Sequence, residues 1–238
     1  MRNLIMAILF LLSASSNAFA GDSAERRIIG FSPDGKWFAF EQFGVQDGSG
    51  FPYYDIFIVD LDNDKWATGT PVRVRIDDED ATLHQARGKA RVKAAPMLAK
   101  LRIIDQGRLI ASNPVTEVAG DTSQITFQAH MNLSGLDYRY RIKLEQFDLP
   151  SEPLCKDLGT QTKGFAISIS KADQPPTQAY RDTTLPKSRG CASRYAIADV
   201  IAANNPGRPN RFVVLVHTFA FGFEGPDARF IAIPVMAP

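Results

Sequence analysis

Acidic residues near the start of the chain are the first candidates for chemistry. Glu41, Asp47 and Asp55 lie close together in the sequence. Two carboxyl groups that meet in a cleft can serve as the acid and the base of a hydrolytic reaction. Spacing along the chain does not show whether these side chains meet. An exported hydrolase that uses acidic residues near Glu41–Asp55 is therefore kept as the alternative function.

The segment DLDNDKWATGTP places aspartates at alternate positions, and oxygen ligands with this spacing suit Ca²⁺. An EF-hand loop requires Gly where Lys65 stands and Glu where Pro71 stands. The pattern fails at both positions, and Lys65 adds a positive charge beside the proposed ion. We therefore interpret Asp60, Asp62 and Asp64 as a polar turn between strands, and we predict no bound metal.

Other catalytic patterns are incomplete. Ser49 lies in DGSGF, but a nucleophile elbow needs Gly where Asp47 stands. His84, His130 and His217 are far apart and form no His-Glu-x-x-His motif, although zinc held by scattered ligands would leave no such motif. His217 lies in an apolar run, so we expect a core histidine bonded to the backbone. No nucleotide-binding loop is present, and we predict no catalytic residue and no cofactor.

Aromatic and basic side chains are candidates for recognition instead of catalysis. Aromatic residues lie within and directly after the loop GVQDGSGFP, and basic residues recur in ARGKARVK and in YRYRIKLEQF. Such groups suit sugars, partner proteins or an anionic polymer. The alternative is that they are core residues and solvated faces. The predicted binding surface comprises Phe51, Tyr53, Tyr54, Arg87, Arg91, Arg139 and Arg141.

The N-terminus has the features of an export signal. Arg2 precedes the apolar run Leu4–Leu12, which is too short to span a bilayer, and Ala18-Phe19-Ala20 is a small-x-small cleavage signal. We expect cleavage after Ala20 and a periplasmic or secreted protein. No later stretch is apolar enough for a membrane helix. The 27 basic and 26 acidic residues nearly cancel, which argues against nucleic acid as the main partner.

Cys155 and Cys191 are the two cysteines of the chain. Export places both in an oxidising compartment, where a disulfide is stable. The competing interpretation is a pair of free thiols for metal or redox chemistry. Because no Cys-x-x-Cys spacing is present, we predict a structural disulfide.

The elements that must position these residues are mainly strands. KWFAFEQ and YDIFIVDL alternate in the manner of paired strands, and YRYRIKLEQF has one apolar and one charged face. RFVVLVHTFAF is apolar on both faces, which predicts a central strand buried on both sides. The sequence thus predicts a mainly β (α+β) fold of antiparallel sheets, forming a single globular domain over residues 21–238.

One helical insertion is predicted near residues 79–104. Leu83, Ala86, Ala90 and Ala94 recur at helical spacing, with acidic residues at the start of the segment and basic residues toward its end. Pro96 is expected to end or kink this helix. A β-propeller would show self-similarity at about 40–45 residues. FSPDG occurs once, so we expect one blade-like N-terminal hairpin unit and not a propeller.

Two segments carry a resemblance to a known family. FSPDGKWFAFEQFGVQDGSGFPYYDIFIVDLDNDKW and HTFAFGFEGPDARFIAIPV resemble a bacterial family of predicted secreted proteins of unknown function. The first hairpin alone resembles a blade of a TolB-like propeller. The family resemblance implies export and a shared fold, and it carries no catalytic residue. We therefore expect a non-catalytic binding or scaffolding module whose partner is an envelope protein or an anionic cell-envelope polymer.

Overall fold

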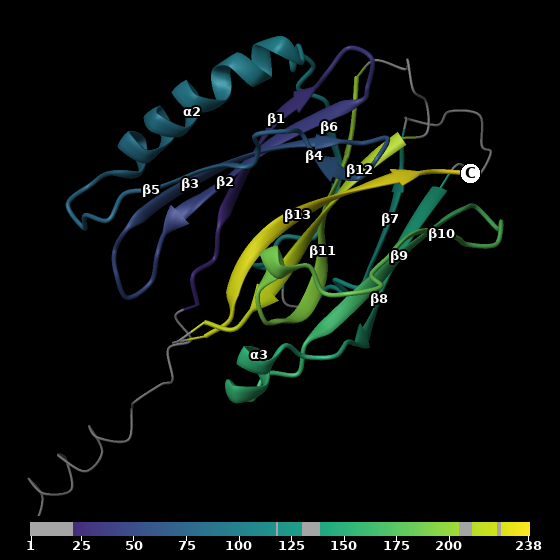
Figure 1. Ribbon diagram of the computed structural model, residues 1–238. Coiled ribbons are helices and arrows are strands. Elements are labelled where there is room, and N and C mark those ends of the chain that lie inside the picture. The colour runs from purple at the N-terminus through teal and green to yellow at the C-terminus, as the bar shows by residue number, and fades with distance from the viewer. Residues whose placement is uncertain (1–20, 118, 130–138, 205–210, 223–224) are drawn as a thin grey trace, which may run out of the picture.

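The computed structural model describes residues 21–117, 119–129, 139–204, 211–222 and 225–238. Within these residues, three antiparallel sheets and one long helix form the body of the molecule (Figure 1). The predicted mainly β fold with a helical insertion is therefore confirmed. His130 and the proposed cleavage site after Ala20 fall outside the described residues.

The N-terminal sheet contains the hairpin that the sequence predicts. Its strands pair antiparallel in the order β1–β2–β3–β4, and β5 pairs with the other part of β3. The hairpin of β2 and β3 is in register from Trp37 opposite Asp60 to Val45 opposite Pro52. The strands of this sheet are β1 (Glu25–Phe31), β2 (Trp37–Val45), β3 (Pro52–Asp60), β4 (Lys65–Trp66) and β5 (Val72–Arg75).

Two further sheets contain the remaining strands. The central sheet has the order β13–β12–β11–β6, and the outer sheet has the order β10–β9–β8–β7. The central strands are β6 (Arg108–Ser112), β11 (Ala192–Ala202), β12 (Arg211–Ala220) and β13 (Asp227–Met236). The outer strands are β7 (Gln124–Gln128), β8 (Arg139–Asp148), β9 (Lys163–Lys171) and β10 (Thr177–Arg181).

The long helix α2 (Leu83–Lys100) lies on the N-terminal sheet. It begins with a capping box, in which Thr82 and Gln85 exchange side-chain-to-backbone hydrogen bonds. Ala86, Ala90 and Ala94 are fully buried against the sheet, as the helical spacing predicts, and their small side chains allow a close approach. The helix continues through Pro96, so of the two effects expected there the end is wrong, and the kink stays a prediction. Pro96 removes one helical hydrogen bond, and tertiary packing around it retains the helix.

The described residues stack in four layers: α2, the N-terminal sheet, the central sheet and the outer sheet. The central sheet packs on both neighbouring sheets because its strands are apolar on both faces. On β12, Val213 and Leu215 pack against the N-terminal sheet, while Phe212, Val214 and Val216 pack against the outer sheet. The predicted double burial of this strand is confirmed. Among the described residues, no helix is both long and apolar enough to cross a membrane.

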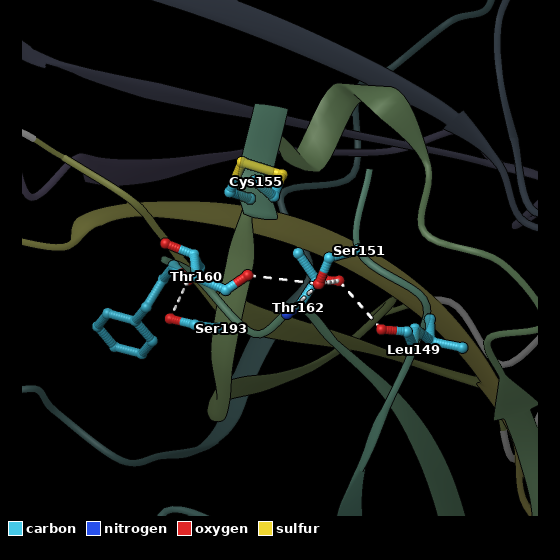
Figure 2. The surroundings of a disulfide bond; sticks show 8 residues. Leu149, Ser151, Cys155, Thr160, Thr162 and Ser193 are labelled. Atoms are coloured by element: carbon cyan, nitrogen blue, oxygen red, sulfur yellow. Dashed lines mark hydrogen bonds between the residues drawn. A yellow bond between two sulfur atoms is a disulfide. The ribbon is translucent and has the colours of Figure 1, made fainter. Parts of the chain in front are cut away.

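The predicted disulfide is also confirmed. Cys155 lies in the short helix α3 (Pro153–Asp157), and Cys191 directly precedes β11, with an S–S distance of 2.05 Å. The helical turn η1 (Lys187–Arg189) leads into Cys191. Beside the bond, Ser151 and Thr162 hydrogen-bond to each other over 2.9 Å, as Figure 2 shows. The disulfide thus ties the outer sheet to the start of a central strand.

We predict that replacing both cysteines by alanine lowers the free energy of unfolding by about 3–4 kcal/mol. The crosslink joins positions 36 residues apart, and its loss returns the conformational entropy of that loop to the unfolded chain. Urea unfolding of wild type and Cys155→Ala/Cys191→Ala measures the difference. A reductant should destabilise the wild type and leave the double variant unchanged. Equal unfolding free energies in the two proteins would contradict the prediction.

Candidate functional site

The acidic residues proposed for hydrolysis lie on opposite faces of the N-terminal sheet. Glu41 is fully buried beneath α2 and accepts hydrogen bonds from the Tyr54 hydroxyl (2.6 Å) and from Arg91 Nε (2.8 Å). Asp55 faces the central sheet and accepts a bond from Gln42 Nε2 over 3.3 Å. Because the sheet separates the two carboxyl groups, they do not form an acid–base pair.

The predicted aromatic surface is mostly inside the protein. Tyr53 and Tyr54 are 5% and 2% exposed, because both faces of β3 are covered. Tyr54 packs on Phe43, and burial raises its pKa to about 12. Tyr53 donates a hydrogen bond to Asp22 over 3.0 Å, and burial raises its pKa as well. Both tyrosines therefore act as buried donors, and of the three predicted aromatic residues only Phe51 is partly exposed.

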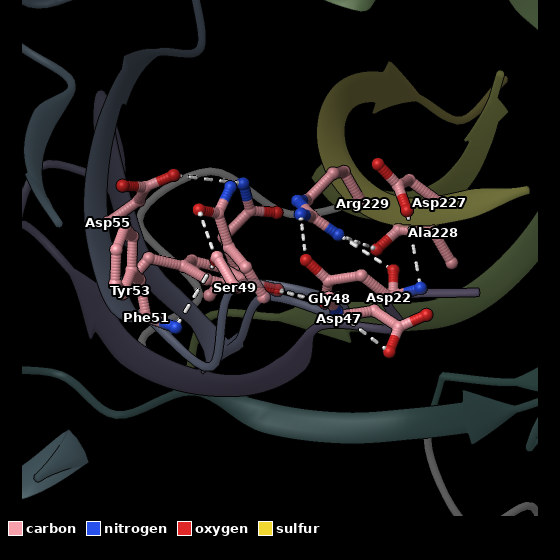
Figure 3. A network of polar contacts seen from close by, with 12 residues as sticks. Asp22, Asp47, Gly48, Ser49, Phe51, Tyr53, Asp55, Asp227, Ala228 and Arg229 are labelled. Carbon is pink, nitrogen blue, oxygen red and sulfur yellow. Dashed lines mark hydrogen bonds and ion pairs between the residues drawn. The ribbon is translucent and has the colours of Figure 1, made fainter. Parts of the chain in front are cut away.

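Asp22 joins the first described residues to β13 (Figure 3). Its carboxylate accepts bonds from Tyr53 and from Arg229 Nη2 (2.5 Å), and its backbone N–H donates to Asp227 Oδ1 over 3.2 Å. Asp47, the third proposed acid, lies in the nearby β2–β3 loop, where it accepts the Gly48 N–H. This network fixes how β1 enters the fold. Sequence patterns could not reveal it, since Asp22 and Arg229 are 207 residues apart.

The predicted basic residues divide between two distant layers. Arg87 and Arg91 belong to α2, and Arg91 forms an ion pair with Glu41. Arg139 and Arg141 belong to β8 of the outer sheet, on the opposite side of the stack (Figure 1). The two groups therefore do not pool their charge, and Arg91 already neutralises a buried carboxylate.

The outward side of the outer sheet carries a basic row. Arg139, Arg141 and Lys143 are exposed and alternate with the buried Tyr140, Ile142 and Leu144 of β8. Successive cations are spaced by about 7 Å, the rise of two strand residues. We call this surface the basic face. The cross-strand neighbours of its three cations are Gln128, Thr126 and Gln124 on β7, with Ser170 and Ser168 on β9.

Hydrogen-bonding groups extend the basic face toward β6. An open hollow beside Arg141 is lined by Ser112, Asn113, Asp121, Gln124 and Thr126. Glu145 follows Lys143 on the same side of β8, so acidic groups flank the row at this end. Arg141 lies between Thr126 and Ser170, which are uncharged. The row therefore presents positive charge beside hydroxyl and amide groups.

His217 is a core histidine, but its Nδ1 does not make the expected bond to the backbone of any described residue. It is 5% exposed and packs on Phe230, with ring centroids 4.2 Å apart. Within the described part of the chain, its Nδ1 has no hydrogen-bond partner. Burial lowers its pKa to about 4; Asp199 opposes this shift, while Arg26 adds to it. Arg26 and Asp199 form an ion pair across the interface between the N-terminal and central sheets.

The aspartates of DLDNDKW form a turn, as the sequence predicts. Asp60 Oδ1 accepts the backbone N–H of Asp62 over 2.9 Å, and its Oδ2 accepts from Asn63 Nδ2 over 2.9 Å. Asp62 pairs with Arg211 over 2.8 Å. Among the described residues, no group of three or more His, Cys, Asp and Glu side chains is arranged to hold a metal ion.

Residues 39–236 match the model of a protein family described as "Predicted secreted protein (DUF2259)". The chain belongs to this family. The matched segment begins within β2 and ends with the last residue of β13, so it includes strands of all three sheets. Membership in DUF2259 supports export of the chain and confirms the resemblance seen in its terminal segments. A comparison with curated proteins finds no match.

We predict that His217 makes the protein less stable in acid. Between about pH 6.5 and pH 4 the histidine is protonated in the unfolded chain and neutral in the fold, so unfolding takes up a proton. Stability contributed by this group is lost as the pH falls through this window, by about 3 kcal/mol in total. The free energy of unfolding, measured from pH 8 to pH 4, should fall less in His217→Phe than in wild type.

The difference between the two pH profiles of unfolding free energy reports His217 alone, because wild type and variant contain the same other titrating groups. His217→Gln provides a second uncharged replacement if the phenylalanine variant folds poorly. Parallel pH profiles for wild type and variant would show that His217 titrates equally in both states.

Proposed function

We propose that this DUF2259 protein is a non-catalytic periplasmic binding module that holds an acidic polysaccharide of the cell envelope on its basic face. The observation that carries the proposal is the row Arg139, Arg141 and Lys143, three exposed cations at a regular spacing on one strand. A strand presents such groups in a straight line, and a linear polymer with repeating negative charge matches that arrangement.

The uncharged neighbours of the row favour a glycan over a simple anion. Thr126, Ser168 and Ser170 offer hydroxyl groups, while Gln124 and Gln128 offer amides, and all of them lie beside the cations. Hydroxyls and amides both donate and accept hydrogen bonds. They can therefore pair with sugar hydroxyls between the acidic groups that the cations bind.

The charge balance of the whole chain predicts how this binding behaves. The net charge is +1, so long-range attraction to an anionic polymer is small. Each exposed ion pair contributes only about 0.2–1 kcal/mol and is screened by salt. Several contacts along one polymer must act together, and binding should weaken steeply as salt rises.

The separation of Glu41 from Asp55 supports binding without catalysis. A glycoside hydrolase of the common type needs two carboxyl groups about 5–10 Å apart across one bond of the sugar. Here the N-terminal sheet separates the two candidates, and Glu41 is tied to Arg91 and Tyr54. The hydrolase alternative built on these residues therefore has no shared cleft in which to operate.

We further propose cleavage after Ala20 and one globular domain over residues 21–238. The cleavage proposal rests on the Ala18-Phe19-Ala20 signal. The domain proposal is supported by the cores that neighbouring sheets share through the central sheet. The intact mass of the exported protein tests the cleavage, since it should correspond to a chain that begins at Gly21.

We predict that Arg139→Gln/Arg141→Gln/Lys143→Gln weakens binding to polygalacturonate roughly tenfold to hundredfold, because three exposed ion pairs are lost. Affinity measured at several salt concentrations should show a smaller salt dependence in the variant. The side chains point outward, so the melting temperature should stay near that of wild type.

A matched control removes the same charge elsewhere. Lys89→Gln/Lys93→Gln/Lys100→Gln changes three exposed lysines of α2 and leaves the basic face intact. This variant should bind polygalacturonate with wild-type affinity. Equal losses of affinity for polygalacturonate in the two triple variants would indicate attraction by net charge alone and would contradict the proposed surface. Absence of binding by the wild type would contradict it as well.

A further inference from the structure

A groove runs along the edge of β13, between the N-terminal sheet and the η1 segment. It consists of two adjoining hollows of about 240 and 200 Å³. Six residues line both hollows: Phe57, Trp66, Ser188, Arg189, Phe230 and Ile231. We call this feature the edge groove. It lies in a different part of the fold from the basic face, because it is bounded by β3, β4, β13 and η1.

The strand edge at the base of this groove is largely capped. The Ala228 N–H donates to Asp22 O over 2.9 Å, and the Phe230 N–H donates to the Gln42 side chain over 2.9 Å. Pro234 has no N–H to offer. An added peptide strand would find few donors here, so a ligand of the groove must be recognised mainly through side chains.

One polar group of the groove lacks a partner. Thr218 lines the smaller hollow and is 3% exposed, and its Oγ1 has no hydrogen bond to any described residue. Leaving a buried hydroxyl unsatisfied costs about 1–3 kcal/mol. A ligand that bonds to this hydroxyl would recover part of that cost, which makes Thr218 a marker of a binding site.

The charged groups that line the smaller hollow each face an opposite charge. Arg189 pairs with Asp182 over 2.7 Å, and Arg229 pairs with Asp22. Arg73 stands opposite Asp55 in the register of β5 and β3. Burial raises the pKa of Asp55, while the Gln42 hydrogen bond and the charges of Arg73 and Arg229 oppose this rise. The smaller hollow therefore suits an uncharged polar ligand better than an ion.

Trp66 supplies a flat apolar surface beside these polar groups. Trp66 is 43% exposed, and its ring meets the ring of Phe57 edge-on, with centroids 6.0 Å apart. The Arg73 guanidinium lies 5.6 Å from the Trp66 ring. A sugar ring has an apolar C–H face and a rim of hydroxyls, so it can stack on the indole while its hydroxyls reach polar side chains.

We propose that the edge groove binds a neutral saccharide unit. Its ring stacks on Trp66, a ligand hydroxyl donates to Asp55, and Arg73 donates to a ligand oxygen. Thr218 and Ser188 exchange hydrogen bonds with further hydroxyls. The proposal does not depend on the basic face, since it rests on other residues and on the balanced charges of the smaller hollow.

Tryptophan fluorescence of the mature chain tests this site. Trp37→Phe leaves Trp66 as the one tryptophan, and this background is titrated with cellotriose, maltotriose and triacetylchitotriose at up to millimolar concentration. At least one trisaccharide should give a saturable change. In the same background, Thr218→Val should weaken binding roughly threefold to tenfold without lowering the melting temperature, because it removes only an unsatisfied hydroxyl.

Further variants separate this site from nonspecific effects. Trp66→Ala and Asp55→Asn should abolish or weaken trisaccharide binding when it is followed by calorimetry. The basic-face variant Arg139→Gln/Arg141→Gln/Lys143→Gln should retain it. Binding by Trp66→Ala and Thr218→Val at wild-type strength would overturn the proposal.

The source of the saccharide is distinguished by a second arm. If the wild type sediments with insoluble cellulose or chitin and Trp66→Ala does not, the ligand of the groove is a polymer chain. Binding of soluble trisaccharides alone would assign it to free sugars. If neither the soluble nor the insoluble arm shows binding that depends on Trp66, the edge groove is not a saccharide site.

Discussion

The fold depends on the double burial of β12. Val213 and Leu215 enter one core, and Phe212, Val214 and Val216 enter the other, so this strand is removed from water on both faces. A single sheet cannot bury both faces of its own strand, because each face needs a covering layer. The N-terminal and outer sheets are those layers, and α2 in turn covers the far face of the N-terminal sheet.

This arrangement determines where recognition can occur. Inner faces of the sheets are occupied by apolar packing, so accessible polar groups are confined to outward faces and to the edges where layers meet. The basic face is an outward face, because alternate residues of β8 are buried and exposed. The edge groove lies at a layer boundary, where β13 ends the central sheet and the N-terminal sheet passes over it.

Local patterns in the sequence predicted the elements better than their contacts. The two apolar sets of β12, the alanine stripe of α2 and the disulfide were all accessible from residue types and spacing. The burial of Tyr53 and Tyr54 was not, because a tyrosine next to a Gly-rich loop looks the same whether or not a neighbouring layer covers it. Their partners, Asp22 and Glu41, become evident only when the strands are in register.

The sites themselves were predictable to different degrees. Arg139 and Arg141 could be placed on one exposed face from the alternation of β8 alone. The groove around Trp66 and Thr218 could not, since β4, β12 and η1 are distant in sequence and meet only through the stacking of sheets. Burial of the Thr218 hydroxyl without a partner is a tertiary property, and no spacing rule reports it.

Ion pairing links the buried layers to the charge at the surface. Among the described residues, the buried carboxylates of Glu41, Asp199, Asp182 and Asp22 each have an arginine partner: Arg91, Arg26, Arg189 and Arg229. A buried carboxylate without such a partner would be strongly destabilising, so these arginines are committed to the fold. The charges of the whole chain nearly cancel, so attraction to a charged partner acts only at short range. In the proposed function the row on β8 attracts an anionic polymer at short range, whereas the smaller hollow of the edge groove, whose charged groups face opposite charges, has no comparable attraction for charge. The two proposals therefore concern chemically different parts of a glycan, one bound by charge and the other by stacking and hydrogen bonds.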